Sequence, residues 1–295
     1  MKIAAIDIGS NAVRLLIKEI VKDKKRIDSI KISYTRVPIR LGEDVFTIGK
    51  ISEEKRYQLT KTIKAFKHLM DVQDINLFRA CATSAMREAS NNKEVLKHIA
   101  KETKIGIDVI TGEQEAELIF SNFVTQKLDR EKVYLYIDVG GGSTELSVIK
   151  KGKKGKAASF KLGTVRILED KDEKRDWNEM KEFSSSLKDK YKHIVGIGTG
   201  GNINRIFKES RRKTYENITF KEIEQIKEYI QSFSMTDRLR LLKLKPDRAD
   251  VIIPAAKIYL YVMRHAGIKE LVVPRIGLSD GIIYDLYQKH LEGKD

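Results

Sequence analysis

The sequence contains two similar stretches, IDIGSNAVRLLI at residues 6–17 and IDVGGGSTELSV at residues 137–148, which align without gaps. In each stretch an apolar run leads to an aspartate, a glycine turn follows, and a second apolar run comes after the turn. This order is typical of a β-hairpin with largely buried strands. Because the copies lie about one domain length apart, the repeat predicts a duplicated fold whose halves face each other across a cleft. Chance similarity of two glycine hairpins is the alternative.

The remainder of the sequence alternates between short apolar runs and amphipathic segments. Residues 52–70 show a helical pattern, since Ser52 suits an N-cap and apolar residues follow at helical spacing. Strands that alternate with helices are typical of the α/β class. Further strands are expected at 25–39, 75–81, 107–110, 156–162, 193–197 and 271–273. Further helices are expected at 92–104, 111–128, 177–191 and 280–290, and from residues 201, 219 and 248.

The chain is long enough for two domains, because 295 residues exceed what a single core usually serves. We place the boundary in the charged stretch 127–132, which gives domain I at residues 1–128 and domain II at residues 129–295. The last helix, 280–292, is left open as an element that packs back onto domain I. With only four prolines and no low-complexity linker, a hinge between the domains is expected.

The charge balance favours an anionic partner. The 57 Lys and Arg residues exceed the 42 Asp and Glu residues, which gives a formal net charge of +15. Nucleic acid, inorganic polyphosphate, nucleotides and an anionic membrane surface all fit this charge, and a solvated basic surface is the alternative. Nucleic acid is disfavoured, because no nucleic-acid-binding motif is recognisable.

Cysteine content and the N-terminal sequence indicate the compartment. Cys81 is the single cysteine and ends an apolar run, so we expect a buried structural thiol in a reducing environment. The chain opens directly into KIAAID after Met1, without the features of a signal peptide. No stretch approaches the ~20 apolar residues of a membrane helix. A cytoplasmic protein without a membrane partner is expected, and a homodimer is left open.

The turn DVGGGS that begins at Asp138 has the character of a phosphate-binding loop. Gly140, Gly141 and Gly142 remove every Cβ from the turn, so backbone N–H groups can approach an anion closely, and Ser143 adds a hydroxyl donor. Asp138, at the end of a strand, is placed to hold a metal ion directly or through water. A tight hairpin with glycines at positive φ is the structural alternative.

The repeated turn near the N-terminus is expected to serve the same ligand. Ser10 and Asn11 occupy positions of the glycine loop and are predicted to bind phosphate. Asp7 aligns with Asp138 and is predicted as a metal ligand. With both turns present, phosphate binding becomes the favoured interpretation.

A third glycine turn, GIGTGGN at residues 196–202, follows an apolar strand and precedes a predicted helix. That context places backbone amides and a helix N-terminus near an anion. The spacing fits neither the dinucleotide-binding fingerprint nor the P-loop, so those folds are disfavoured. The predicted phosphate-binding residues of this turn are Gly198, Thr199, Gly200 and Gly201.

Glu115 is a candidate general base. Thr111 and Gln114 form a capping-box pattern, and Glu113 suits the first turn of the helix that follows. Helix capping and the helix dipole account less well for the presence of Glu115. A carboxylate at a helix start beside bound phosphate is suited to orient and deprotonate an attacking water.

Arg87 is a candidate phosphate ligand. It lies about one turn after Thr83 and Ser84, either of which suits the cap of a short helix. The planar fork of arginine matches phosphate oxygens. An ordinary solvent-facing arginine is the alternative.

Together these motifs resemble the exopolyphosphatase and guanosine pentaphosphate phosphohydrolase family, Ppx/GppA. The motifs that carry the resemblance are IDIGSN at 6–11, ATSAMR at 82–87, GEQEA at 112–116, DVGGGSTE at 138–145 and GTGGN at 198–202. The resemblance continues through 162–166 and 277–281 and so spans nearly the whole chain. It implies two actin-like domains, a duplicated ribonuclease H-like α/β fold, with catalysis in the cleft.

The resemblance also implies roles for single residues. Glu115 matches the catalytic glutamate, Arg87 the phosphate-binding arginine, and Asp138 with Glu145 the metal and phosphate loop, with Mg²⁺ as the usual cofactor. The implied reaction is hydrolysis of a phosphoric anhydride. Water would release the terminal phosphate of inorganic polyphosphate or guanosine pentaphosphate.

Two departures from the family pattern bear on substrate choice. Many members carry an acid where this chain has Gln114. Long members continue into helical C-terminal domains, including an HD-type domain, that this sequence lacks, so short polyphosphate is the expected substrate. An actin-like kinase or ATPase, or a non-enzymatic sensor of polyphosphate or guanosine alarmones, are the alternatives.

Overall fold

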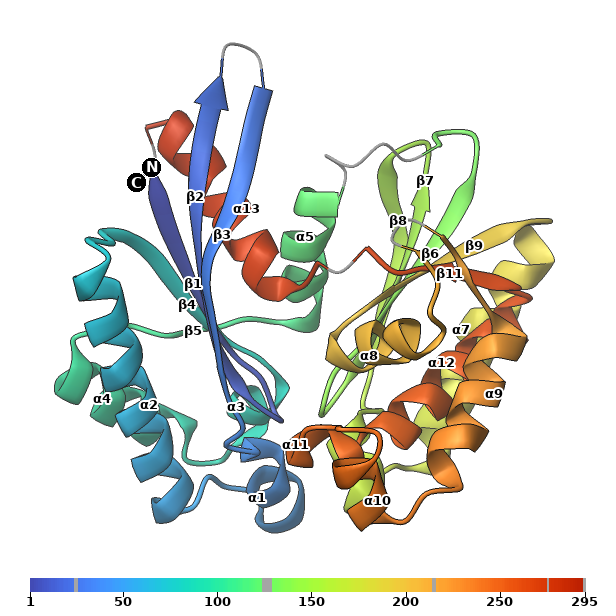
Figure 1. Ribbon diagram of the computed structural model, residues 1–295, viewed down its shortest axis with the longest axis horizontal. Coiled ribbons are helices and arrows are strands. Elements are labelled where there is room, and N and C mark those ends of the chain that lie inside the picture. Colours follow the sequence, from blue (N-terminus) through green and yellow to red (C-terminus); the bar gives the residue numbers. More distant parts are fainter. Residues whose placement is uncertain (24–25, 124–128, 214–215, 275, 294–295) are drawn as a thin grey trace. The chain divides into compact units, whose positions relative to one another are not determined.

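The chain forms two compact units in a computed structural model (Figure 1). The structure describes residues 1–23, 26–123, 129–213, 216–274 and 276–293. Unit 1 comprises Met1–Gln126 and Gly277–Asp295, and unit 2 comprises Lys127–Ile276. Each unit is built on one mixed sheet.

Unit 1 contains a five-stranded sheet with the order β3-β2-β1-β4-β5. Its strands are β1 (Lys2–Ile8), β2 (Val13–Asp23), β3 (Arg26–Val37), β4 (Leu77–Ala82) and β5 (Asp108–Val109). The central strand β1 pairs antiparallel with β2 and parallel with β4. All but the first residue of β1 are buried, as expected of a strand covered on both faces.

Helices pack on both faces of this sheet. The helices of unit 1 are α1 (Leu41–Ile48), α2 (Glu53–Val72), α3 (Ser84–Glu88), α4 (Asn92–Thr103), α5 (Gly112–Phe123) and α13 (Leu278–Leu291). In Figure 1 the pair α2 and α4 lies on one face, and the pair α5 and α13 lies on the other. α13 packs on both α5 and β1, and the Lys18 ammonium lies 2.7 Å from the Asp280 carboxylate. The predicted domain II, residues 129–295, includes α13, which here packs within unit 1. The packing of the last helix, 280–292, onto domain I had been left open in the prediction from the sequence.

Unit 2 contains a six-stranded sheet with the order β10-β11-β9-β6-β7-β8. Its strands are β6 (Val133–Val139), β7 (Thr144–Lys150), β8 (Lys153–Phe160), β9 (Ile194–Thr199), β10 (Ile218–Thr219) and β11 (Glu270–Val272). The central strand β6 pairs antiparallel with β7 and parallel with β9.

The core of unit 2 centres on one apolar helix, α12 (Ile252–Ala266). It packs against α7, α8 and α9 and against β6 and β9, so most of its residues are buried. The other helices of the unit are α6 (Thr164–Leu168), α7 (Lys174–Lys190), α8 (Gly201–Glu209), α9 (Phe220–Gln231), α10 (Met235–Arg240) and α11 (Pro246–Ala249).

The two sheets repeat one topology. In each unit the first three strands form an antiparallel meander, and the first strand then pairs in parallel with a later strand. Thus β1, β2, β3 and β4 correspond to β6, β7, β8 and β9. The prediction of a duplicated α/β fold is confirmed.

Most predicted helices and strands are present, with ends that differ by a few residues. Ser52 caps α2, since its hydroxyl oxygen accepts a hydrogen bond from the Lys55 amide at 3.2 Å. α5 ends its described part at Phe123, so residues 124–128 of the predicted helix lie outside the described residues. Helices α1, α6 and α10 were not predicted from the sequence. α1 begins after Arg40, which has a left-handed φ of 56° and no side-chain cap, so the usual start signals are missing.

Cys81 is buried on β4, as expected, and burial raises the pKa of its thiol to about 12, so the thiol stays protonated and poorly nucleophilic at neutral pH. Among the described residues, the helices are too short or too polar to cross a bilayer.

Candidate active site

The glycine loop of unit 2 connects β6 to β7 and is held from one side by the start of α6. The carbonyl oxygens of Gly140 and Gly141 accept hydrogen bonds from the amides of Thr164 (3.0 Å) and Val165 (2.8 Å). The Gly142 carbonyl accepts a bond from the buried Nε of Arg166 at 2.6 Å. Three successive carbonyls therefore point toward α6.

This anchoring fixes the direction of the loop amides. In a trans peptide the C=O and N–H groups point in opposite directions, and the described part of the chain contains no cis bond. The amides of Gly141, Gly142 and Ser143 therefore point away from α6, toward one side of the loop. A row of N–H groups with a common direction is a concave site for an anion. This geometry suits a phosphate-binding role of the backbone at Gly141, Gly142 and Ser143, whereas the Gly140 amide donates to the Ser143 carbonyl at 2.9 Å and the Ser143 hydroxyl donates to Glu145 at 2.6 Å.

Close packing around the loop explains one further glycine. A Cβ atom at Gly163 would lie 2.3 Å from the Gly141 carbonyl oxygen and 2.5 Å from the Gly142 carbonyl carbon. Only a residue without a side chain allows the start of α6 to approach the loop this closely. Gly163 therefore determines how the phosphate loop is seated.

The equivalent loop of unit 1 is anchored in the same manner. The Ser10 carbonyl accepts a hydrogen bond from the Gly42 amide at 2.8 Å, and the Asn11 carbonyl accepts one from the Arg40 amide at 3.1 Å. The unpredicted helix α1 thus has the place that α6 has in unit 2. The Ser10 hydroxyl is itself buried, 2.8 Å from the Ser84 hydroxyl of α3.

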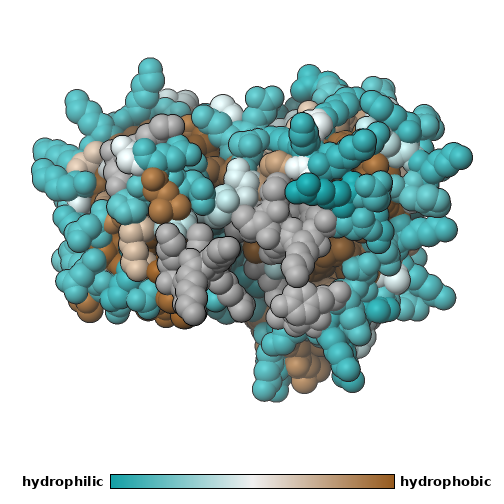
Figure 2. All heavy atoms as spheres, turned by 90° about the horizontal axis from the view of Figure 1, so that it is seen from above, coloured by the Kyte–Doolittle hydropathy of each residue, from teal (hydrophilic) through white to brown (hydrophobic). Residues whose placement is uncertain are grey.

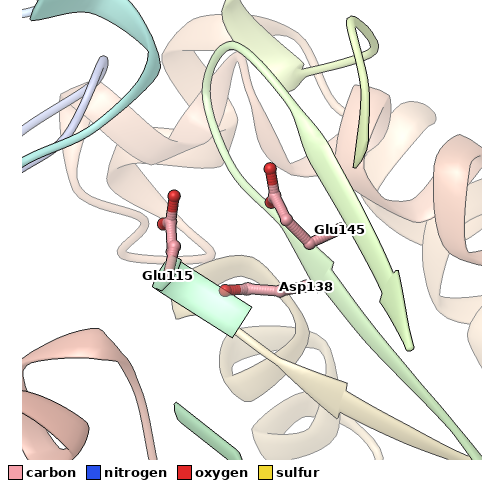
Figure 3. Close-up of side chains that lie close together, drawn as sticks. All are labelled: Glu115, Asp138 and Glu145. Atoms are coloured by element: carbon pink, nitrogen blue, oxygen red, sulfur yellow. The ribbon is translucent and has the colours of Figure 1, made fainter. Parts of the chain in front are cut away.

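Asp138 and Glu145 extend from neighbouring strands at the base of the glycine loop (Figure 3). They are register partners on β6 and β7. Glu145 is buried, and its Oε1 accepts hydrogen bonds from the hydroxyls of Ser143 (2.6 Å) and Ser159 (3.0 Å). Two carboxylates held side by side are hard oxygen donors of the kind that Mg²⁺ prefers, and a cation between them would offset their repulsion. These residues fit a divalent metal site.

Unit 1 carries a different pair at the same positions. Asp7 is the counterpart of Asp138, but its register partner is Arg14 rather than a glutamate. The Arg14 Nη1 lies 2.6 Å from the Asp7 carboxylate, which is buried. The Arg14 guanidinium thus supplies beside Asp7 the positive charge that a metal ion would supply beside Asp138. The role of Asp7 as a metal ligand stays a prediction, with Arg14 as a competitor for its carboxylate.

The third glycine turn lies beside Asp138 within unit 2. Gly200 has a φ of 103°, a value that favours glycine, and a Cβ there would lie 3.3 Å from the Asp138 carboxylate. Thr199 is the register partner of Asp138. The structure thus brings the predicted residues Gly198, Thr199, Gly200 and Gly201 to the same end of the sheet as Asp138.

Two buried tyrosines hold this third turn in place. The Thr199 hydroxyl lies 2.6 Å from the Tyr136 hydroxyl, and the Thr199 carbonyl accepts a hydrogen bond from the Tyr259 hydroxyl. Complete burial, together with the nearby charge of Asp138, raises the pKa of Tyr259 well above its usual value. The Tyr259 phenol therefore stays a hydrogen-bond donor throughout the physiological pH range.

In unit 1, Glu115 lies in the first turn of α5 and is half-buried (Figure 3). The predicted capping box is formed, because the Gln114 side chain accepts from the Thr111 amide at 2.8 Å and the Thr111 hydroxyl accepts from the Gln114 amide at 3.2 Å. Gln114 therefore fixes the start of the helix that carries Glu115. An amide side chain performs this task as well as a carboxylate would.

Arg87 is held next to the same helix. Its Nη1 donates a 2.6 Å hydrogen bond to the Ile110 carbonyl, one residue before Thr111. The short helix α3 that carries Arg87 begins after Thr83, whose side chain makes no cap bond. Arg87 is thus tied to the segment that leads into Glu115, and its remaining guanidinium donors are the ones suited to phosphate.

Three residues that shape the two loops were not predicted from the sequence. Arg166 anchors Gly142, Ser159 orients Glu145, and Arg14 pairs with Asp7. The available signal for Arg14 was its alignment with Glu145 in the internal repeat. For Arg166 the signal was its position three residues after Gly163, within one of the family-like motifs.

Comparison with known proteins gives the family. A sequence model of the Ppx/GppA phosphatase family matches residues 20–290. The "Bifunctional 3-dehydroquinate synthase/phosphatase" of Fusobacterium nucleatum is 29% identical over 92% of this chain, which spans only 44% of that protein's length. "Exopolyphosphatase 1" of Mycobacterium tuberculosis is 26% identical over 99% of this chain and 90% of its own length.

Solved structures show the same fold. The crystal structure of the Aquifex aeolicus Ppx/GppA family member superposes with a TM-score of 0.75 at 26% identity, over 98% of each chain. An exopolyphosphatase structure from Cytophaga hutchinsonii gives a TM-score of 0.82 at 24% identity, over 100% of this chain and 99% of that one. The predicted class of phosphoric-anhydride hydrolase agrees with these findings. The chain belongs to the Ppx/GppA phosphatase family.

Proposed function

We propose that this chain is a phosphohydrolase that releases the terminal phosphate of inorganic polyphosphate, with guanosine pentaphosphate as the second candidate substrate. The observation that carries the proposal is the glycine loop of unit 2, whose amides at Gly141, Gly142 and Ser143 share one direction. Such a row of donors suits the oxygens of a phosphoryl group. Membership of a phosphatase family supports hydrolysis over phosphate binding alone.

A divalent metal ion, Mg²⁺ in our proposal, belongs at Asp138 and Glu145. When bound, it would offset the negative charge that gathers on the phosphoryl oxygens during transfer. The seryl hydroxyls of Ser143 and Ser159 orient the Glu145 carboxylate for this task. The predicted ligand Asp7 is the weaker candidate, because Arg14 already binds its carboxylate.

In the proposed reaction, a water oxygen attacks the terminal phosphorus, and the bond from that phosphorus to the bridging oxygen breaks. Glu115 accepts the proton that the water loses, and the shortened chain leaves with the electrons of the broken bond. Arg87 binds the terminal phosphate through guanidinium donors other than the Nη1 that contacts Ile110. The reaction requires Glu115 and Arg87 of unit 1 to reach the phosphate held by unit 2 during turnover.

Phosphate release from a panel of substrates tests the proposal. The panel contains tripolyphosphate, polyphosphates of graded length, guanosine pentaphosphate and ATP, each with Mg²⁺ and after chelation. Glu115→Gln should lower kcat by roughly 10²–10⁴-fold, the usual size of general base catalysis, while substrate binding persists. Glu113→Gln is the matched control, because Glu113 is exposed in the same helical turn.

The same panel separates the competing activities. Equal turnover by Glu115→Gln and the wild type would remove Glu115 as the base. Transfer of phosphate from ATP to an acceptor, without release from polyphosphate, would indicate a kinase. Tight polyphosphate binding without turnover under several divalent metals would indicate a sensor.

A further inference from the structure

A basic depression lies at the end of the unit 2 sheet where β6 and β9 begin. It has a volume of about 530 Å³ and is lined by residues before and at the start of β6 and by the segment that joins α7 to β9. Its charged and aromatic lining residues are Glu131, Lys132, Lys190, Tyr191, Lys192 and His193. On the face of unit 2 seen in Figure 2, hydrophilic side chains predominate.

A further lysine joins the depression from β7. Lys150 is the register partner of Val133, which lines the depression at the start of β6. The ammonium groups of Lys150 and Lys190 lie 5.5 and 5.6 Å from the centroid of the Tyr191 ring. Cation–π attraction therefore holds the side chains of Lys150 and Lys190 next to the Tyr191 ring. A site with such preordered charges loses less side-chain entropy when an anion binds.

Three of the four lysines at the basic depression lack an acidic partner among the described residues. Within the described residues, Lys150, Lys190 and Lys192 form no ion pair, and Lys132 has only a 3.7 Å contact with Asp129. Some lysines elsewhere on the surface do have close acidic partners, such as Lys64 with Glu102 at 2.6 Å and Lys289 with Asp285 at 2.8 Å. The depression thus gathers three lysines whose charges no close ion pair neutralises, although Glu131 also lines it.

Its position relates the depression to the glycine loop. The depression lies where β6 begins, and the loop follows the end of the same strand at Val139. Seven residues of strand at ~3.3 Å each separate the two sites by roughly 20 Å, within one compact unit. A flexible linear polyanion is long enough to occupy both ends of this strand, whereas a short one is not.

We propose that the basic depression is a docking site for the distal part of a linear polyphosphate chain whose terminal phosphate occupies the glycine loop. The inference rests on the proposed function for its substrate. Lysine supplies compact point charges suited to a uniform phosphate chain. The Tyr191 ring carries two ammonium groups over it instead of standing open for base stacking, which favours inorganic polyphosphate over nucleic acid. Long chains, rather than the short ones expected from the sequence, would gain most from this site.

Charge reversal tests the site. In Lys150→Glu/Lys190→Glu/Lys192→Glu, the Kd for long-chain polyphosphate, measured by titration calorimetry with metal chelated, should rise about tenfold, the order expected for three exposed charge contacts. The KM for long chains should rise by a similar factor, while kcat/KM for tripolyphosphate stays unchanged.

A variant with the same change in charge is the control. Lys61→Glu/Lys93→Glu/Lys221→Glu replaces three exposed lysines outside the depression. Lys61 resembles Lys150 and Lys190 in that its ammonium group lies over a tyrosine ring, 5.2 Å from the centroid of Tyr57. This control variant should bind long chains as the wild type does. Equal loss in both triple variants would overturn the site, since net charge alone would then explain the binding. Selective loss of binding to single-stranded DNA, with polyphosphate unaffected, would overturn it in favour of a nucleic-acid surface.

The binding measurement also separates this inference from the proposed function. If the wild type binds long polyphosphate through the depression but releases no phosphate, the proposed reaction fails and the site stands. If phosphate is released and the depression variant binds long chains normally, the site fails and the reaction stands.

Discussion

Gly281 of α13 lies against the backbone of Leu118 in α5, so closely that a Cβ atom at residue 281 would be 2.2 Å from the Leu118 carbonyl oxygen. Leu118 follows Glu115 by three residues on the same helix, so the two lie nearly one turn apart. The contact between α13 and α5 therefore determines where the helix that carries the candidate base can sit.

We predict that Gly281→Ala separates the two helices. The added methyl group should lower the free energy of unfolding by about 1–3 kcal/mol, as overpacking of a tight contact does, and should lower kcat because α5 moves. Urea denaturation and phosphate release measure these effects. Gly277→Ala is the control, because a Cβ at Gly277 meets no atom within 4 Å and its φ is −152°. Wild-type stability and kcat in Gly281→Ala would contradict the proposed contact.

A second prediction concerns Gly163, whose close contact with Gly141 and Gly142 determines the position of the glycine loop. Gly163→Ala would place a Cβ 2.3 Å from the Gly141 carbonyl oxygen, so the loop must shift and its amides lose their common direction. We expect kcat to fall by roughly 10²–10³-fold, the loss typical when a backbone donor to a reacting anion is displaced. Steady-state phosphate release measures the loss. Gly155→Ala should be nearly neutral, because its Cβ would meet nothing closer than 3.6 Å.

Metal dependence gives a third prediction. Glu145→Gln removes a charge beside Asp138, so the Mg²⁺ concentration for half-maximal activity should rise by about 10–100-fold, a range seen when even the partners of metal ligands are lost. Titration of activity with Mg²⁺ measures the shift. Glu182→Gln, which changes an exposed carboxylate on α7, should leave the titration unchanged. An unchanged Mg²⁺ requirement in Glu145→Gln would exclude Glu145 as a ligand.

A fourth prediction concerns Cys81 and pH. Burial raises the pKa of the thiol from 9.0 to about 12, so above pH 9 the unfolded chain loses the proton before the folded chain does. The free energy of unfolding should therefore fall between pH 9 and pH 12, by up to roughly 1.4 kcal/mol per pH unit from this group. Urea denaturation from pH 8 to pH 10.5 measures the slope. Cys81→Ala should have a smaller slope in that range, and identical slopes would contradict the assignment.

The sequence was sufficient for the duplicated hairpins because their chemistry is local. A strand, an aspartate, a glycine turn and a second strand are all contiguous in the chain, and they appear twice. The caps at Ser52 and Thr111 were predictable for the same reason, since a side chain there bonds a backbone group three residues away. The correspondence of Arg14 with Glu145 was also visible, but its meaning depends on which residue faces each aspartate across the sheet.

Long-range features were beyond the sequence. The anchoring of Gly142 by Arg166 and the orientation of Glu145 by Ser159 join residues far apart in the chain. The basic depression likewise combines Lys150 of one strand with Lys190 at the end of α7. Helix α1 was missed because its start is held by carbonyls of the distant Ser10 and Asn11 rather than by a capping side chain.

The return of α13 to unit 1 affects the order in which the protein folds during synthesis. Unit 2 is one continuous segment, Lys127–Ile276, whereas unit 1 needs Gly277–Asp295 to cover β1 and α5. Domains generally fold as units as the ribosome delivers them. Unit 1 is translated first, but its apolar face at β1 and α5 stays uncovered until α13 has been synthesised. Unit 2 is translated second and reaches its native packing before unit 1 does.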